Sequence, residues 1–159
     1  RSYKGIPLLE QLLKKESQKF VLVGSGLSHL NKYPNVKIYE NISEKKKADI
    51  VSKASALLMT STSRNEAFGI VLVESLRSGI PILSPDLNSG VSFVNQDNLT
   101  GFFYKTGDIN DLRIKLKKFI TLELSKYLEL RFQARLRYKQ IFNLDNMIDS
   151  LDEIYYEIS

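Results

Sequence analysis

The chain has 159 residues, 43% of them hydrophobic and 26% charged, and its 23 Lys and Arg against 18 Asp and Glu give a net charge of +5. This length is typical of one domain with a core of its own. With no Cys and one His, His29, the composition excludes disulfide scaffolds, Cys-ligated zinc, iron–sulfur clusters, thiol catalysis and multi-His metal sites. No apolar run reaches the about 18 residues of a membrane span, and no signal peptide is recognisable, so we expect a cytoplasmic, soluble domain. The small positive charge favours anionic ligands but is too low to indicate nucleic acid.

Predicted strands and helices alternate over the first two thirds of the chain. Apolar residues at helical spacing predict helices over residues 6–15, 49–55 and 70–77. Short apolar runs bounded by Gly, Pro or polar residues predict strands over residues 19–23, 36–39, 56–60, 81–84 and 101–104. Because parallel strands need helical crossovers, this order predicts one α/β domain, with a Rossmann-like parallel sheet and helices on both faces.

From residue 108 onward only helices are predicted. The apolar residues that share a helix face form three sets: Leu112, Leu116, Phe119 and Ile120; Leu124, Leu128 and Phe132; and Met147, Leu151, Ile154, Tyr155 and Ile158. The pattern contains no internal repeat or linker, so the helices are expected to belong to the same domain.

Two loops are candidate ligand sites, because ligands of open α/β sheets bind beyond the carboxyl ends of the strands. The first, Gly24-Ser25-Gly26, resembles the start of a dinucleotide-binding fingerprint, but the third glycine is replaced by His29. A tight turn that leads from a strand to a helix explains these glycines better than a dinucleotide site does.

The second loop, residues 63–74, is the more informative one. A strand runs into polar residues, and an apolar helix then begins near Gly69. The first backbone N–H groups of that helix have no partner within the helix, so they form an anion site suited to a phosphate. Gly69 has no Cβ and lets a ligand approach the backbone closely.

Two acidic residues flank this helix start. Glu66 lies in the loop, where it either acts on a ligand or stabilises the helix N-terminus by its negative charge. Glu74 lies within the apolar helix, where an ionised carboxylate needs hydrogen-bond donors. The hydroxyl groups of a sugar would supply them; a buried ion pair with an Arg, or a backbone donor, is the structural alternative.

Residues 66–81 read Glu-Ala-Phe-Gly-Ile-Val-Leu-Val-Glu-Ser-Leu-Arg-Ser-Gly-Ile-Pro. This segment resembles the Glu-x7-Glu signature of the family-4 retaining glycosyltransferases, which have the two-domain GT-B fold. Further segments are similar to motifs of the same family in the same order: Arg-Ser-Tyr-Lys-Gly at residues 1–5, Ser-Gly-Val-Ser-Phe-Val-Asn at 89–95, and Thr-Gly-Phe-Phe-Tyr at 100–104 followed by Gly-Asp at 107–108. Ala67, Thr62 and Glu40 depart from the usual residues of the family, but none removes a reactive side chain.

The resemblance implies transfer of a sugar from a nucleotide-diphosphate sugar with retention of configuration. It implies that Glu66 contacts the donor sugar as the catalytic residue and that Glu74 binds the ribose hydroxyls. The remaining donor-binding groups that it implies are the cations Arg1 and Lys4, beside the diphosphate, and the backbone N–H groups of Phe68, Gly69, Ile70 and Val71. Since a helix N-terminus and two cations can stabilise the leaving diphosphate, and the sequence has no Asp-x-Asp pair, neither a metal nor a cofactor is expected.

On this interpretation residues 1–159 are a single donor-binding domain, the C-terminal domain of a longer enzyme whose N-terminal acceptor domain is absent. We expect it to bind nucleotide-sugar but to transfer little or no sugar alone, and to serve bacterial surface polysaccharide synthesis. The alternatives are a nucleotide-sugar epimerase, which can share the GT-B fold, and a non-catalytic nucleotide-binding domain; the incomplete glycine pattern disfavours a dinucleotide dehydrogenase.

Two clusters of basic residues have alternative interpretations. The run at residues 44–47, Glu-Lys-Lys-Lys, is explained by a solvated turn or helix start, with contact to a base or phosphate as the alternative. Residues 113–139 hold nine basic residues against Glu123 and Glu129, which indicates solvated helix faces or peripheral contact with an anionic membrane.

Overall fold

The computed structural model describes residues 4–63 and 69–143. Its helices are α1 (Ile6–Lys15), the 3₁₀ helix η2 (Ser28–Lys32), α2 (Glu44–Ser52), α3 (Ile70–Arg77), α4 (Gly90–Val94), α5 (Ile109–Ile120) and α6 (Leu124–Ile141). Its strands are β1 (Phe20–Val23), β2 (Val36–Tyr39), β3 (Leu57–Leu58), β4 (Ile82–Pro85) and β5 (Gly101–Tyr104). The predicted α/β class is confirmed.

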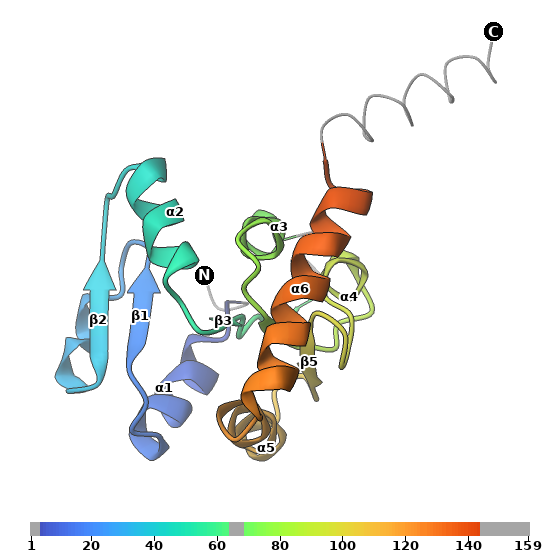
Figure 1. Cartoon of the computed structure of the whole chain (residues 1–159). Coiled ribbons are helices and arrows are strands. Elements are labelled where there is room, and N and C mark those ends of the chain that lie inside the picture. Colours follow the sequence, from blue (N-terminus) through green and yellow to red (C-terminus); the bar gives the residue numbers. More distant parts are fainter. Residues whose placement is uncertain (1–3, 64–68, 144–159) are drawn as a thin grey trace, which may run out of the picture.

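The strands form two separate sheets, and within each sheet the strands are parallel (Figure 1). β1 pairs with β2 in the register Phe20 to Val36, while β4 lies between β3 and β5 in the other sheet. The alternation of strands and helices indicated parallel strands but not which strands are neighbours. Among the described residues β1 and β3 are not paired, so the strands do not form the single sheet that we expected.

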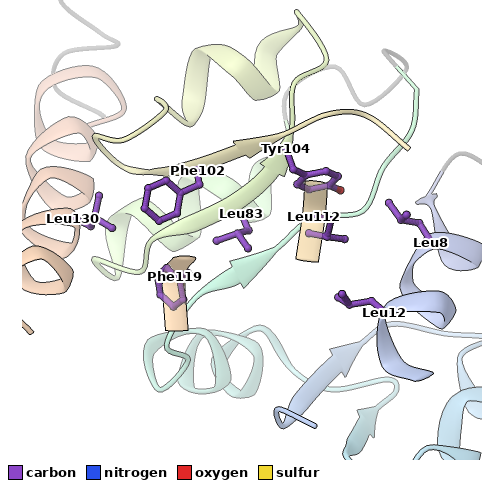
Figure 2. Packing of buried hydrophobic residues seen from close by; sticks show 8 residues of the cluster. All are labelled: Leu8, Leu12, Leu83, Phe102, Tyr104, Leu112, Phe119 and Leu130. Atoms are coloured by element: carbon purple, nitrogen blue, oxygen red, sulfur yellow. The ribbon is translucent and has the colours of Figure 1, made fainter. Parts of the chain in front are cut away.

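Helix α1 joins the two sheets through opposite sides of its apolar face. Leu9 and Leu13 pack with residues of β1 and β2, including Leu22. Leu8 and Leu12 pack in another cluster with Leu83, Phe102, Tyr104, Leu112, Phe119 and Leu130 (Figure 2). All four leucines are buried, so displacing α1 would open both clusters to water.

Helix α2 begins five residues earlier than the pattern predicted and ends at Ser52. Its N-cap residue Ser43 accepts a hydrogen bond from the backbone N–H of Lys46 at 3.2 Å. Glu44 follows in the first turn, where its negative charge is favourable. The polar sequence at residues 44–47 therefore belongs to a helix, although it lacks the apolar spacing from which a helix is recognised.

Helix α6 packs through a different face from the one that the leucine spacing indicated. Leu130 and Ala134 are fully or almost fully buried, whereas Leu124, Leu128 and Phe132 are exposed. The predicted helix is correct, but its strongest apolar stripe does not face the core. The predicted stripe from Met147 to Ile158 lies outside the described residues.

Buried side-chain hydrogen bonds connect the strands of the sheet formed by β3, β4 and β5 with one another and with neighbouring loops. The Tyr104 hydroxyl of β5 donates to the carbonyl of Met59, just after β3, at 2.7 Å. Burial raises the pKa of Tyr104, so its hydroxyl stays protonated as a donor. Asn95 donates to Ser84 at 2.9 Å and accepts from the Thr100 hydroxyl at 2.9 Å, which ties β4 to the loop before β5.

Candidate functional site

The candidate site lies beyond the carboxyl end of β3, where the chain passes through residues 59–63 and later re-enters the described structure at Gly69. This is the edge of a parallel sheet at which ligands of α/β folds bind. The structure describes five of the eight site residues that the sequence indicated: Lys4, Gly69, Ile70, Val71 and Glu74. Arg1, Glu66 and Phe68 lie outside the described residues, so their roles stay predictions.

The backbone at Lys4 and Gly5 is held directly against this edge. The Thr60 hydroxyl donates to the carbonyl of Lys4 at 3.0 Å. Gly5 has φ of 67°, and a Cβ at this position would lie 1.7 Å from the Thr60 carbonyl oxygen. Only glycine fits such an approach. The structure thus brings Lys4 beside the loop that leads to α3, although 56 residues separate Lys4 from Thr60.

Gly69 sets the start of α3. It is the N-cap residue with φ of 65°, and a Cβ there would lie 3.0 Å from the Met59 side chain. Gly69 has no side chain with which to cap the helix, and the first turn contains no acidic residue. Ile70, the first residue of the helix, is 73% exposed. The backbone N–H groups at this end are therefore suited to an anionic ligand.

Glu74 lies on the second turn of α3, and its two carboxylate oxygens are in different environments. Oε1 pairs with Nζ of Lys47 from α2 at 2.9 Å. Oε2 is buried and has no hydrogen-bond partner among the described residues. The ion pair that we considered as the structural alternative exists, with a lysine in place of an arginine. It satisfies one oxygen, while the other is buried and has no donor among the described residues.

Lys47 itself is held by two carboxylates. Its Nζ lies 2.6 Å from Oε2 of Glu44 and 2.9 Å from Oε1 of Glu74. The hydrogen bond with Glu44 and, to a smaller extent, the one with Glu74 raise the pKa of Lys47, so its ammonium group stays charged. The predicted helix start at residues 44–47 is confirmed, but Lys47 is not fully solvated, because it pairs with Glu74 where α2 packs against α3 and its side chain is only 27% exposed.

An open hollow continues the site along the sheet edge. It is lined by Thr62 after β3, by Asp86, Leu87 and Asn88 after β4, and by Thr106 after β5. The lining is mostly polar, so a hydroxyl-rich ligand that reaches across the three strand ends would find donors and acceptors there.

The glycine turn after β1 does not lead into an α-helix. Gly24 and Gly26 have φ of 146° and 76°, and the turn continues into the short 3₁₀ helix η2. Glu40, after β2, closes the turn by accepting from the backbone N–H of Leu27 at 3.2 Å. A dinucleotide site needs a helix N-terminus at this place, so the geometry agrees with a structural turn. The turn itself was correctly predicted, but the helix that follows it is 3₁₀.

His29 lies on η2, and its Nε2 is 4.0 Å from Glu10 of α1. Its side chain is exposed, and this contact directs it toward α1 rather than toward the candidate site. In the described ranges, no three His, Cys, Asp or Glu side chains gather in a way that could hold a metal ion.

Most of the nine basic residues between positions 113 and 139 interact with other groups of the chain. Side-chain and carbonyl partners are observed for Arg113, Lys118, Lys126, Arg131 and Arg137. Two of these contacts, Arg113 with Glu16 and Lys126 with Glu129, pair the cation with a carboxylate, whereas a hydrogen bond to a carbonyl leaves the positive charge unpaired. Within the part of the chain that the structure describes, none of the helices combines the length and apolar character that crossing a bilayer requires.

Sequence reasoning missed two residues that shape the site, Lys47 and Thr60. Lys47 is one of three consecutive lysines, and nothing in its spacing distinguishes it from the other two. Thr60 was expected only as the end of a strand. Both contacts join segments far apart in the chain, so a local sequence pattern carries no signal for them.

Comparison with known proteins places this geometry in a family. The family model described as "Glycosyl transferases group 1" matches residues 1–138. O-antigen chain mannosyltransferase C of Escherichia coli is 27% identical over 165 residues, covering 98% of this chain and 44% of that protein. D-rhamnosyltransferase WbpZ of Pseudomonas aeruginosa is 26% identical over 150 residues, covering 89% of this chain and 39% of that protein.

Solved structures share the fold. A glycosyltransferase from Rickettsia africae superposes with a TM-score of 0.84 at 22% identity, covering 99% of this chain and 45% of that one. HepE from Anabaena, solved in complex with UDP, superposes with a TM-score of 0.83 at 19% identity, covering 99% of this chain and 46% of that one. The chain thus spans less than half the length of these relatives. Because the family model covers most of its residues, the chain belongs to the glycosyl transferases group 1 family.

Proposed function

We propose that this chain is the donor-binding domain of a glycosyltransferase that uses a nucleotide-diphosphate sugar. We further assign it to the C-terminal half of a GT-B enzyme of family 4, on the motifs at residues 1–5 and 66–81. In this proposal the acceptor binds to a separate N-terminal domain of the same enzyme. The fraction of each relative that the chain spans, 44% and 39% for the two transferases above, supports this proposal.

The observation that carries the proposal is the unequal pair of carboxylate oxygens on Glu74. A buried carboxylate oxygen without a hydrogen-bond donor is energetically unfavourable. Ribose hydroxyl groups are neutral donors, and in this proposal they hydrogen-bond to Oε2 while Oε1 keeps its contact with Lys47. HepE was solved with UDP and with UDP-glucose, which supports a nucleotide-sugar as the ligand class.

In this proposal the start of α3 and Lys4 bind the diphosphate. The backbone N–H groups of Gly69, Ile70 and Val71 begin a helix without an acidic first turn, and Lys4 is held beside the same strand end. When the nucleoside diphosphate leaves, negative charge develops on it, and fixed donors and cations stabilise that charge. Together with Arg1 they would do so without a metal ion or other cofactor. The N–H of Phe68 would contribute at the same helix start.

We propose Glu66 as the catalytic residue that faces the donor sugar. A carboxylate next to the anomeric carbon stabilises an oxocarbenium-like transition state. Retention of configuration is part of this proposal and rests on the family-4 resemblance. It can be tested by determining the anomeric configuration of the product by NMR spectroscopy.

The names of the relatives support a role in bacterial surface polysaccharide synthesis, since one is an O-antigen mannosyltransferase and another a lipopolysaccharide 1,6-galactosyltransferase. We place the protein in the cytoplasm, with peripheral contact to the anionic inner face of the membrane. The exposed stripe of Leu124, Leu128 and Phe132 on α6, among basic residues, supports that contact. Sedimentation with liposomes that does not depend on anionic lipid would contradict it.

Calorimetric titration of the 159-residue chain with UDP, GDP and their sugars tests the proposed function. We expect one nucleotide to bind and Glu74→Ala to weaken it about 10-fold or more, because a charged hydrogen-bond partner is lost. Glu129→Ala is the matched control, since Glu129 also pairs with a lysine, at 2.8 Å, but lies on α6. Unchanged binding in Glu74→Ala would refute the ribose contact. Sugar transfer by the chain alone would refute the need for a partner domain.

A further inference from the structure

We infer that Lys47 is a positioning residue for Glu74 and thereby determines how strongly the site prefers ribose to 2′-deoxyribose. The inference rests on the proposed function, since it assigns the ribose contact to Glu74. It adds a residue outside the Glu-x7-Glu segment, on a different helix, to the binding of the nucleotide.

The first step is the fixed position of the ammonium group. Lys47 Nζ lies between Oε2 of Glu44 at 2.6 Å and Oε1 of Glu74 at 2.9 Å, so carboxylates from α2 and α3 hold it at once. The Lys47 side chain is 27% exposed. Lys46, one residue earlier, is 49% exposed and reaches Asp49 only at 3.8 Å. Of these two lysines, Lys47 is therefore the one that links the helices.

The second step is the effect of this contact on Glu74. A glutamate has three rotatable side-chain bonds, and the terminal one is loosely restricted in the absence of a partner. Lys47 fixes Oε1 and thereby the plane of the carboxylate. Oε2 is then buried and left without a partner among the described residues. The carboxylate is oriented before the ligand arrives, so the ligand does not have to order it.

The third step is the chemistry of the ligand. Ribose offers two neighbouring hydroxyl donors, and a carboxylate of fixed orientation can accept from both. A 2′-deoxyribose offers only one of these donors. A freely rotating carboxylate still accepts one hydrogen bond, but it loses part of the benefit of the second. Removing Lys47 should therefore weaken ribonucleotide binding more than deoxyribonucleotide binding.

Lys47 stays charged under ordinary conditions, because its contacts with Glu44 and Glu74 raise its pKa. The link between the helices is therefore present throughout the pH range in which nucleotide binding is measured.

The experiment compares dissociation constants of the 159-residue chain for UDP and dUDP, and for GDP and dGDP, by calorimetry. The variants are Lys47→Met, Lys47→Arg, Lys46→Met and Glu74→Gln. We expect wild type and Lys46→Met to prefer the ribonucleotide equally. We expect Lys47→Met to lower that preference by about 3- to 10-fold, the cost of ordering one long side chain. Lys47→Arg, which keeps the charge, should restore most of the preference.

Three results would overturn the inference. Equal weakening of the ribo and deoxy forms would mean that Lys47 contacts another part of the nucleotide, such as a phosphate. A lower melting temperature of Lys47→Met with an unchanged preference would mean a structural role alone. If Lys47→Met does not fold, Lys47→Arg provides the test. A preference of Lys47→Arg for the ribonucleotide far below that of wild type would contradict the inference that the positive charge positions Glu74.

Failure of this inference can be distinguished from failure of the proposed function. If Glu74→Gln loses the preference for ribose while Lys47→Met keeps it, the ribose contact stands and only the role of Lys47 is refuted. If Glu74→Gln binds the ribonucleotide and the deoxyribonucleotide as wild type does, the ribose contact of the proposed function is refuted and this inference with it.

Discussion

Gly5→Ala is the substitution that tests how the site is assembled. Gly5 precedes α1, has φ of 67°, and approaches the Thr60 carbonyl so closely that a Cβ would lie 1.7 Å from that oxygen. A Cβ essentially never comes closer than 3.0 Å to such an atom. The backbone at Gly5 or Thr60 would therefore have to move by about 1.3 Å, the difference between these distances.

Two separate costs contribute to the expected loss of stability. A non-glycine residue in the left-handed region costs about 1–2 kcal/mol. Forcing the backbone to shift adds about 1–3 kcal/mol, as in an overpacked core. The shift is resisted because α1, which begins at Ile6, buries four leucines against both sheets. We expect Gly5→Ala to lower the free energy of unfolding by about 2–5 kcal/mol.

Gly26→Ala separates the two costs. Gly26 has φ of 76°, close to that of Gly5, but no described heavy atom lies within 4 Å of the position that a Cβ would take there. This control should therefore lose only the about 1–2 kcal/mol of left-handed strain. Urea denaturation of both variants measures the difference, which corresponds to about 0.5–1.5 M in the midpoint for a slope near 2 kcal/mol per M. A loss for Gly5→Ala no greater than that for Gly26→Ala would refute the close approach of Lys4 and Gly5 to Thr60.

Two further predictions concern buried and charged groups. Asn95→Ala removes the hydrogen bonds to Ser84 and Thr100, and all three residues are fully buried. We expect it to lower the free energy of unfolding by about 2–4 kcal/mol. A urea midpoint within about 0.3 M of the wild-type midpoint, which is close to the precision of the measurement, would contradict this prediction. Because the pKa of folded Lys47 is raised above its ordinary value of 10.5, its stabilising contribution should be full below pH 10.5 and disappear as the pH rises through the folded-state pKa. The melting-temperature difference between wild type and Lys47→Met, measured from about pH 8 to 11.5, should be constant at first and then shrink; a difference that grows with pH would contradict the sign.

Much of the site could be predicted because its signals are local. Gly69 precedes an apolar helix, Glu74 interrupts the apolar run, and Lys4-Gly5 forms part of a recognisable segment. Each of these depends on residues that are close together in the chain. The structure places Lys4 and Gly69 beside Thr60 and Met59 at the end of β3, the edge of a parallel sheet at which ligands bind.

What the sequence could not supply is the set of contacts between segments. Lys47 has the same local environment as Lys45 and Lys46 in the sequence, yet only the packing of α2 on α3 gives it Glu74 as a partner. Likewise, Leu124, Leu128 and Phe132 form a clear apolar stripe, but α6 buries Leu130 and Ala134 instead. A helical period identifies the residues that share a face, but not which of two faces meets the core.

Composition by itself determined that these 159 residues contain no thiol and no multi-His metal site, and the order of the segments determined an α/β chain with parallel strands. The tertiary structure decided that these strands lie in two sheets joined by α1, and that one oxygen of Glu74 is paired with Lys47 while the other is buried without a partner among the described residues. The physical reason is the separation along the chain of the residues that interact. Propensity, capping and periodicity act within a few residues, whereas pairing of strands and of charges depends on which distant surfaces come together when the chain folds.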